Sequence, residues 1–163
     1  MSHPHEALVR DAYHAFNDGD IDGFLEAFAE DAVLHGADGQ LQGRVAIRGV
    51  VEQLVELSEN TLRIEVHDVL ANDDHTVMLQ LTKAKRGDRV LEDRVVYVFH
   101  INDGLIVDAY FQGDPGVQED FYSGRKNFRP YRHIRAIWMT LGGQLLLLGG
   151  AVGAQTRNLA DRK

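Results

Sequence analysis

The spacing of apolar residues changes once along the chain, near residue 60, and this change separates predicted helices from predicted strands. Up to that point apolar side chains recur every three or four positions, as they do on one face of an amphipathic helix. A short strand is expected at residues 32–35, with residues 41–43 pairing back on it. Around it the pattern predicts three helices, near residues 4–17, 20–28 and 45–59.

Beyond residue 60, four runs rich in β-branched and aromatic residues predict strands at residues 62–70, 76–85, 90–101 and 105–111. The last two runs flank Asp103-Gly104, and an Asp-Gly pair in this setting is a strong hairpin signal. The first strand of this hairpin is apolar at nearly every position, which is typical of a strand covered on both faces. We therefore expect the hairpin at the centre of the sheet.

Helices followed by a run of antiparallel strands predict an α+β fold. A curved, mainly antiparallel sheet would wrap around the N-terminal helices and leave a conical pocket between the two layers. Residues 1–122 are expected to form this domain, and residues 123–163 a C-terminal extension. The aromatic residues expected to line the pocket, with core packing as the alternative, are Tyr13, Phe16, Phe28, Phe99 and Phe111.

Charge and composition exclude several classes of function. Residues 1–122 carry nine Lys/Arg and 24 Asp/Glu, a net charge of −15, which argues against nucleic-acid binding by this domain. The chain has no cysteine, which excludes disulfides, thiolate metal sites and cysteine nucleophiles. No histidine pair has metal-ligand spacing on one helix, so we expect neither a metal nor a cofactor. The first residues lack the features of a signal peptide, so we expect a cytoplasmic protein.

The C-terminal extension has the opposite charge. Residues 123–163 carry eight Lys/Arg and a single Asp, a net charge of +7, and five of the cations lie between Arg125 and Arg135. Residues 137–154 then contain no charge, and eighteen such residues are near the lower limit for crossing a membrane. Three alternatives stay open: the extension docks on the acidic domain, attaches the protein to a membrane surface, or is disordered.

Four short phrases carry a resemblance to a known family: residues 16–22 (FNDGDID), 28–33 (FAEDAV), 42–48 (QGRVAIR) and 102–107 (NDGLIV). Together, in their order and spacing, they resemble the SnoaL-like branch of the nuclear transport factor 2-like superfamily, which includes ketosteroid isomerase, polyketide cyclases and limonene epoxide hydrolase. The resemblance implies a conical α+β fold, often dimeric through the outer face of the sheet. The chain departs from the catalytic patterns of these relatives at Gly36 and Phe111, where they place an acid.

Four side chains near the expected pocket are candidates for acid–base chemistry. His35 would be the general base or proton shuttle, because imidazole titrates near neutral pH. Tyr97 would donate a hydrogen bond to a developing oxyanion, and Asp114 or Asp93 would orient the base. Each has a structural alternative: a strand-end histidine, a core tyrosine, a turn residue at Asp114 and a solvated strand edge at Asp93. The enzyme hypothesis requires His35 and Tyr97 to face the same cavity.

Two hypotheses about function follow from these features. The first is a cofactor-independent isomerase, cyclase or hydratase that acts on an apolar carbonyl compound. The second is a non-catalytic ligand-binding or assembly module, which the departures at Gly36 and Phe111 favour. The expected partners are a small apolar ligand and a second copy of the chain in a homodimer, with a membrane as a partner only through residues 137–154.

Overall fold

The protein folds into one curved six-stranded sheet with helices packed against it, as predicted for the α+β class. The computed structural model describes residues 3–36 and 39–123, so the C-terminal extension with its apolar segment, residues 137–154, lies outside the described residues. Within the described residues, no helix is long and apolar enough to cross a membrane. The elements are α1 (Pro4–Asn17), α2 (Ile21–Glu26), β1 (Phe28–Gly36), β2 (Gly39–Gln42), α3 (Arg44–Leu57), β3 (Arg63–Ala71), β4 (Thr76–Arg86), β5 (Arg89–Asn102), β6 (Leu105–Gln112) and α4 (Pro115–Ser123).

The strand order is β2-β1-β6-β5-β4-β3, which confirms that the β5–β6 hairpin lies at the centre of the sheet. Neighbouring strands are antiparallel except for β1 and β6, which run parallel. Asp103 and Gly104 form the hairpin turn with φ angles of 50° and 75°. Two consecutive positive φ angles define the tight turn that Asp-Gly favours, because glycine has no Cβ to clash there.

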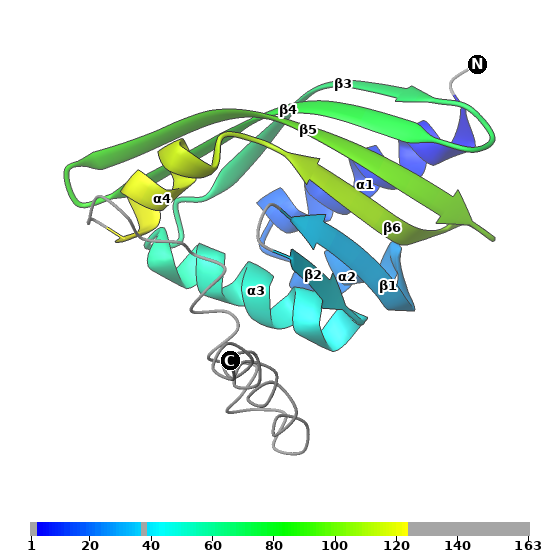
Figure 1. Ribbon diagram of the computed structural model, residues 1–163, viewed down its shortest axis with the longest axis horizontal. Coiled ribbons are helices and arrows are strands. Elements are labelled where there is room, and N and C mark those ends of the chain that lie inside the picture. The colour runs from blue at the N-terminus through cyan, green and yellow to red at the C-terminus, as the bar shows by residue number, and fades with distance from the viewer. Residues whose placement is uncertain (1–2, 37–38, 124–163) are drawn as a thin grey trace, which may run out of the picture.

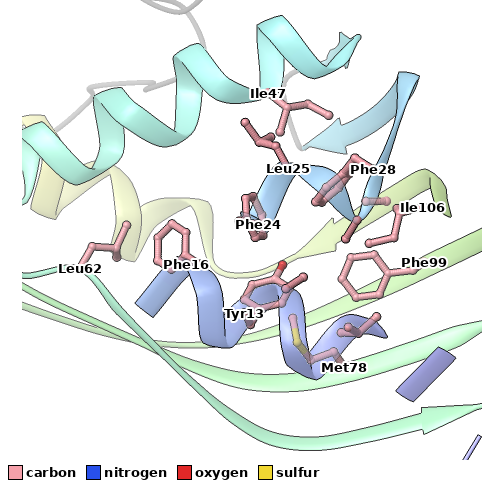
Figure 2. Packing of buried hydrophobic residues seen from close by; sticks show 14 of the residues in the cluster. Tyr13, Phe16, Phe24, Leu25, Phe28, Ile47, Leu62, Met78, Phe99 and Ile106 are labelled. Atoms are coloured by element: carbon pink, nitrogen blue, oxygen red, sulfur yellow. The ribbon is translucent and has the colours of Figure 1, made fainter. Parts of the chain in front are cut away.

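The sheet arches over α1, and the helices lie on its concave side (Figure 1). We call this the inner face of the sheet and the opposite side the outer face. Figure 2 shows the core between the two layers, where Tyr13 of α1 and Phe24 of α2 pack near Phe99 of β5 and Met78 of β4. The apolar face of each helix therefore packs against alternate residues of the strands. This agrees with the helical spacing of three to four residues before residue 60 and the alternation of period two in the strands.

Phe28 differs from its predicted position in the second helix. That helix ends at Glu26, and Phe28 begins β1 opposite Ile106 of β6. The Ile106 N–H donates to the carbonyl of Ala27 at 2.8 Å, so a pairing with a distant strand ends the helix. The strand predicted at residues 32–35 consequently extends over nine residues, from Phe28 to Gly36.

Asn17, the last residue of α1, binds the backbone of β3 through both ends of its amide. Its Nδ2 donates to the carbonyl of Ile64 at 2.7 Å, and its Oδ1 accepts from the N–H of Ile64 at 2.9 Å. Since β3 is an edge strand, these two backbone groups would otherwise lack a partner within the sheet. Asn17 therefore both fastens α1 to the sheet and satisfies part of its free edge.

Candidate functional site

The two faces of the central strands separate the candidate residues into two groups. On β5, Asp93, Val95, Tyr97 and Phe99 alternate onto one side, and Phe99 is fully buried in the core beneath the helices. This side is therefore the inner face. The residues between them alternate onto the outer face, where His100 lies opposite Asp108 of β6.

The inner face carries a group of polar side chains that we call the inner polar cluster: Gln80, Thr82, Asp93 and Gln118. Asp93 is only 5% exposed, and its Oδ2 accepts a hydrogen bond from Nε2 of Gln118 on α4 at 2.8 Å. Thr82 of β4 lies directly opposite Asp93 of β5. Nε2 of Gln80 donates to Oγ1 of Thr82 at 2.9 Å. The cluster thus lies on two adjacent central strands, and α4 supplies one of its hydrogen bonds.

Asp93 is an unusual group for this position, because a buried carboxylate is costly unless it is paired or well hydrogen-bonded. Among residues 3–36 and 39–123, no cation forms an ion pair with it. Its neighbours Glu92 and Arg94 are exposed, whereas strand alternation turns Asp93 inward. The alternative of a solvated strand edge is therefore wrong for Asp93, although it describes the residues on either side.

Gly113 lies close to the carboxylate of Asp93 and to the ring of Phe111. A Cβ atom at Gly113 would lie 2.5 Å from Cζ of Phe111 and 3.1 Å from Oδ2 of Asp93, so the chain passes close to both side chains. The ring of Phe111 also meets that of Tyr97 edge to face, with centroids 5.5 Å apart. Gly113 therefore lies close to both Asp93 and Phe111, and Phe111 in turn contacts Tyr97.

Tyr13 brings a second phenol to the inner side of the sheet. Its ring lies 6.4 Å from that of Tyr97 and 5.4 Å from that of Phe24. Burial raises the pKa of Tyr13 well above its ordinary value, because the phenolate would lose its hydration. Tyr13 is therefore held as a neutral phenol, the form that donates a hydrogen bond.

The structure places the five predicted pocket residues on the helix-covered side of the sheet. Tyr13, Phe16, Phe28 and Phe99 are buried in the core, as Figure 2 shows, whereas Phe111 is partly exposed. Ring pairs connect them through Phe24, which lies 5.5 Å from Phe16 and 5.1 Å from Phe28. Phe111 is the member that lies nearest to the inner polar cluster.

His35 does not lie beside Tyr97, which corrects the expectation that the two face one cavity. His35 pairs with Tyr110 of β6 and stacks on its ring at 4.1 Å, whereas Tyr97 pairs with Phe111, the next residue along β6. Adjacent residues of a strand point to opposite faces, so His35 belongs to the outer face. There its Nε2 lies 2.8 Å from Oδ1 of Asp108. The histidine is thus part of an outer His–Asp pair.

Asp114 is the other candidate that the structure separates from the inner polar cluster. Its Oδ1 accepts from the N–H of Gly116 at 2.8 Å and from the N–H of Val117 at 3.4 Å. These bonds make Asp114 the N-cap of α4, with Pro115 at the first helical position. Its side chain is engaged in starting the helix that covers Asp93.

Three members of the inner polar cluster, Gln80, Thr82 and Gln118, were not among the candidates predicted from the sequence. The signal for the first two is periodicity. Gln80 and Thr82 occupy the same alternating positions of β4 as the buried Met78 and Ala84, so strand alternation places them, like Thr76, on the buried face although they are polar. No comparable signal exists for Gln118, because only the packing of α4 on β5 brings it to Asp93. In the part of the chain that the structure describes, no group of three or more His, Asp or Glu side chains is placed to hold a metal ion.

The fold is that of a conical α+β protein of the nuclear transport factor 2-like superfamily. The SnoaL-like domain family matches residues 9–109, more than half of the chain. This protein therefore belongs to the SnoaL-like domain family. A search among curated proteins found no match.

Several solved structures share the fold. Bal32a, from a soil-derived mobile gene cassette, is 26% identical with a TM-score of 0.69, over 73% of this chain and 96% of Bal32a. AclR, a putative hydroxylase from Streptomyces galilaeus, is 17% identical with a TM-score of 0.59, over 68% of this chain and 78% of AclR. TerC, co-crystallized with polyporic acid, is 16% identical with a TM-score of 0.62, over 69% of this chain and 92% of TerC. At identities below 25%, the last two comparisons establish the fold alone.

Proposed function

We propose that this SnoaL-like protein binds an apolar carbonyl compound against the inner face of its sheet and moves a proton through Asp93. One observation carries the proposal: Asp93 is a buried carboxylate with a single amide partner among the described residues, on the face where the apolar core gives way to polar side chains. A carboxylate in such surroundings is a suitable general base for abstracting a proton next to a carbonyl group.

Two further features support this role. Tyr97 lies on the same face of β5 as Asp93, and the ring of Phe111 meets that of Tyr97 edge to face. In the proposed reaction the Tyr97 hydroxyl donates a hydrogen bond to the carbonyl oxygen while negative charge develops there. Proton abstraction next to a carbonyl is the first step of isomerisation, aldol-type cyclisation and related reactions, so the proposal keeps these reaction classes together. No cofactor is needed for this step.

The test measures proton abstraction directly with a simple bicyclic ketone. We expect the full-length protein to accelerate exchange of the C1 protons of 2-tetralone for deuterium in D₂O, followed by proton NMR. Asp93→Asn should lower the rate about 100-fold or more, because general base catalysis is worth roughly 10² to 10⁴. The matched control is Asp108→Asn, which removes a strand carboxylate from the outer face and should leave the rate unchanged.

Two outcomes would contradict the proposal. Equal rates for the wild type and Asp93→Asn would show that Asp93 is not the base. A loss of rate in Asp108→Asn but not in Asp93→Asn would move the chemistry to the outer His35–Asp108 pair.

A non-catalytic ligand-binding module is the second candidate function. The departure at Phe111 favours it, because an apolar ring occupies a position where relatives place an acid. This module would bind 2-tetralone, as seen in NMR chemical-shift changes on the inner face, without accelerating the exchange of its protons. The same experiment therefore separates the two functions.

A further inference from the structure

We infer that the ligand of the inner polar cluster is an apolar molecule that carries a hydrogen-bond donor, a hydroxyl or an amide N–H, and that Gln80 recognises this donor. The inference rests on the proposed function, since it takes the inner face as the ligand site. It narrows the expected ligands to compounds that carry a hydrogen-bond donor, because a ketone without a donor would leave the Gln80 acceptor unpaired.

The first evidence is the hydrogen bonding of Gln80 itself. Its side chain is only 5% exposed, and its Nε2 is engaged with Oγ1 of Thr82 at 2.9 Å. Its Oε1 is fully buried and has no hydrogen-bond partner among the described residues. Buried polar atoms in proteins nearly always have partners, so an acceptor left open on the face of a proposed ligand site requires an explanation.

No described neighbour of Gln80 on the strands donates a hydrogen bond to this oxygen. Across the sheet Gln80 lies opposite Val66 of β3 and Val95 of β5. Along β4 the preceding residue on the same face is Met78, and the following one is Thr82, which already accepts from the Gln80 amide. Most strand neighbours of Oε1 of Gln80 are therefore apolar, and we assign the donor that this oxygen lacks to the ligand.

The rest of the cluster is also richer in acceptors than in donors. A carboxylate such as Asp93 can accept several hydrogen bonds and, within residues 3–36 and 39–123, receives one, from Gln118. Gln80 and Gln118 each use one of their two amide N–H donors on a bond inside the cluster. Such a site favours a ligand that donates and disfavours an anionic ligand.

The expected selectivity follows from the cost of an unpaired buried group. A site built to hydrogen-bond a ligand hydroxyl rejects the analogue that lacks it, because the protein acceptor then stays desolvated and unpaired. We expect a preference of about tenfold or more in Kd for a donor-bearing ligand over its methylated analogue.

The experiment compares 2-naphthol with 2-methoxynaphthalene, two probes of the same ring system that differ in the donor. Their Kd values are measured by NMR titration of the full-length protein. The wild type should bind 2-naphthol at least tenfold more tightly. Gln80→Met, which keeps the length of the side chain and removes the acceptor, should abolish the preference while 2-methoxynaphthalene still binds. The matched control, Gln40→Met, alters an exposed glutamine beside His35 and should keep the preference.

A second variant keeps the test decisive if Gln80→Met does not fold. Gln80→Glu retains an acceptor at this position and should retain the preference for 2-naphthol. Equal Kd values for the two probes in the wild type, or a preference that persists in Gln80→Met, would overturn the inference. If 2-tetralone is bound or turned over without any preference for the donor, this inference fails and the proposed function stands. If none of the three compounds binds, both fail.

Discussion

Replacing Asn17 by alanine should destabilise the domain by breaking the connection between α1 and the edge strand β3. The substitution removes two hydrogen bonds to Ile64, one donated and one accepted, at 2.7 and 2.9 Å. Each neutral hydrogen bond contributes about 1 kcal/mol to the free energy of unfolding. Alanine favours a helix over asparagine by roughly 0.5 kcal/mol, which offsets part of the loss. The net expected loss is about 1.5 kcal/mol, and it increases to the extent that the Ile64 groups stay shielded from water.

Urea unfolding followed by circular dichroism measures this loss, with the m value expected to stay unchanged. For a chain of this size, each kcal/mol corresponds to a decrease in Tm of about 2–4 °C, so we expect Tm to fall by roughly 3–6 °C. Asn17→Asp retains the acceptor for the Ile64 N–H but places a carboxylate oxygen near the Ile64 carbonyl. It should therefore cost at least as much as Asn17→Ala.

Asn102→Ala provides the matched control for Asn17→Ala. Asn102 is an exposed residue at the end of β5, and its replacement should change the free energy of unfolding by less than about 0.5 kcal/mol. A loss below about 0.5 kcal/mol in Asn17→Ala would refute the reasoning, since it would mean that water replaces both bonds at no cost.

Two further predictions concern Tyr13 and the outer face of the sheet. The pKa of Tyr13 is raised in the folded protein, so above pH 10 the unfolded chain loses the phenol proton first, and the free energy of unfolding should fall as the pH rises. Tyr13→Phe should make this fall less steep when the free energy of unfolding is measured by urea titration at several pH values. An unchanged dependence on pH in Tyr13→Phe would contradict a buried phenol. The homodimer stays a prediction, with the outer face as its site, because Leu79 and Leu70 are 36% and 58% exposed there. Leu79→Lys should convert a dimer into a monomer in analytical ultracentrifugation, whereas exposed Val45→Lys on α3 should not, and a monomeric wild type would refute the prediction.

Prediction from sequence succeeded where the determinants are local. Asp103-Gly104 needs only its own backbone preferences to form a turn, and the apolar runs on either side need only each other to pair. The resemblance to the SnoaL-like family rests on phrases of this kind, and the family match to residues 9–109 confirms it. Phe28 shows the limit of such reasoning, because its helical spacing was outweighed by a parallel pairing with β6, nearly eighty residues further along the chain.

The candidate site was predictable only in part, and Asp93 shows why. Strand alternation separates Asp93 from Glu92 and Arg94, but it does not say which face of the strand will be covered. The packing of α1 and α4 on one side decides this. It buries Asp93, whereas Glu92 and Arg94 on either side stay exposed. Gln118 lies even further from sequence reasoning, since its role depends on where a separate helix comes to rest.

The sequence by itself determined the class of fold, the central hairpin and the family. It did so because hydrophobic period and turn chemistry act over a few residues. Only the tertiary structure decided that His35 belongs to the outer face and that Asp114 caps α4. In a strand, one residue of register exchanges the two faces, and that register is set by pairing with β6 rather than by β1 itself.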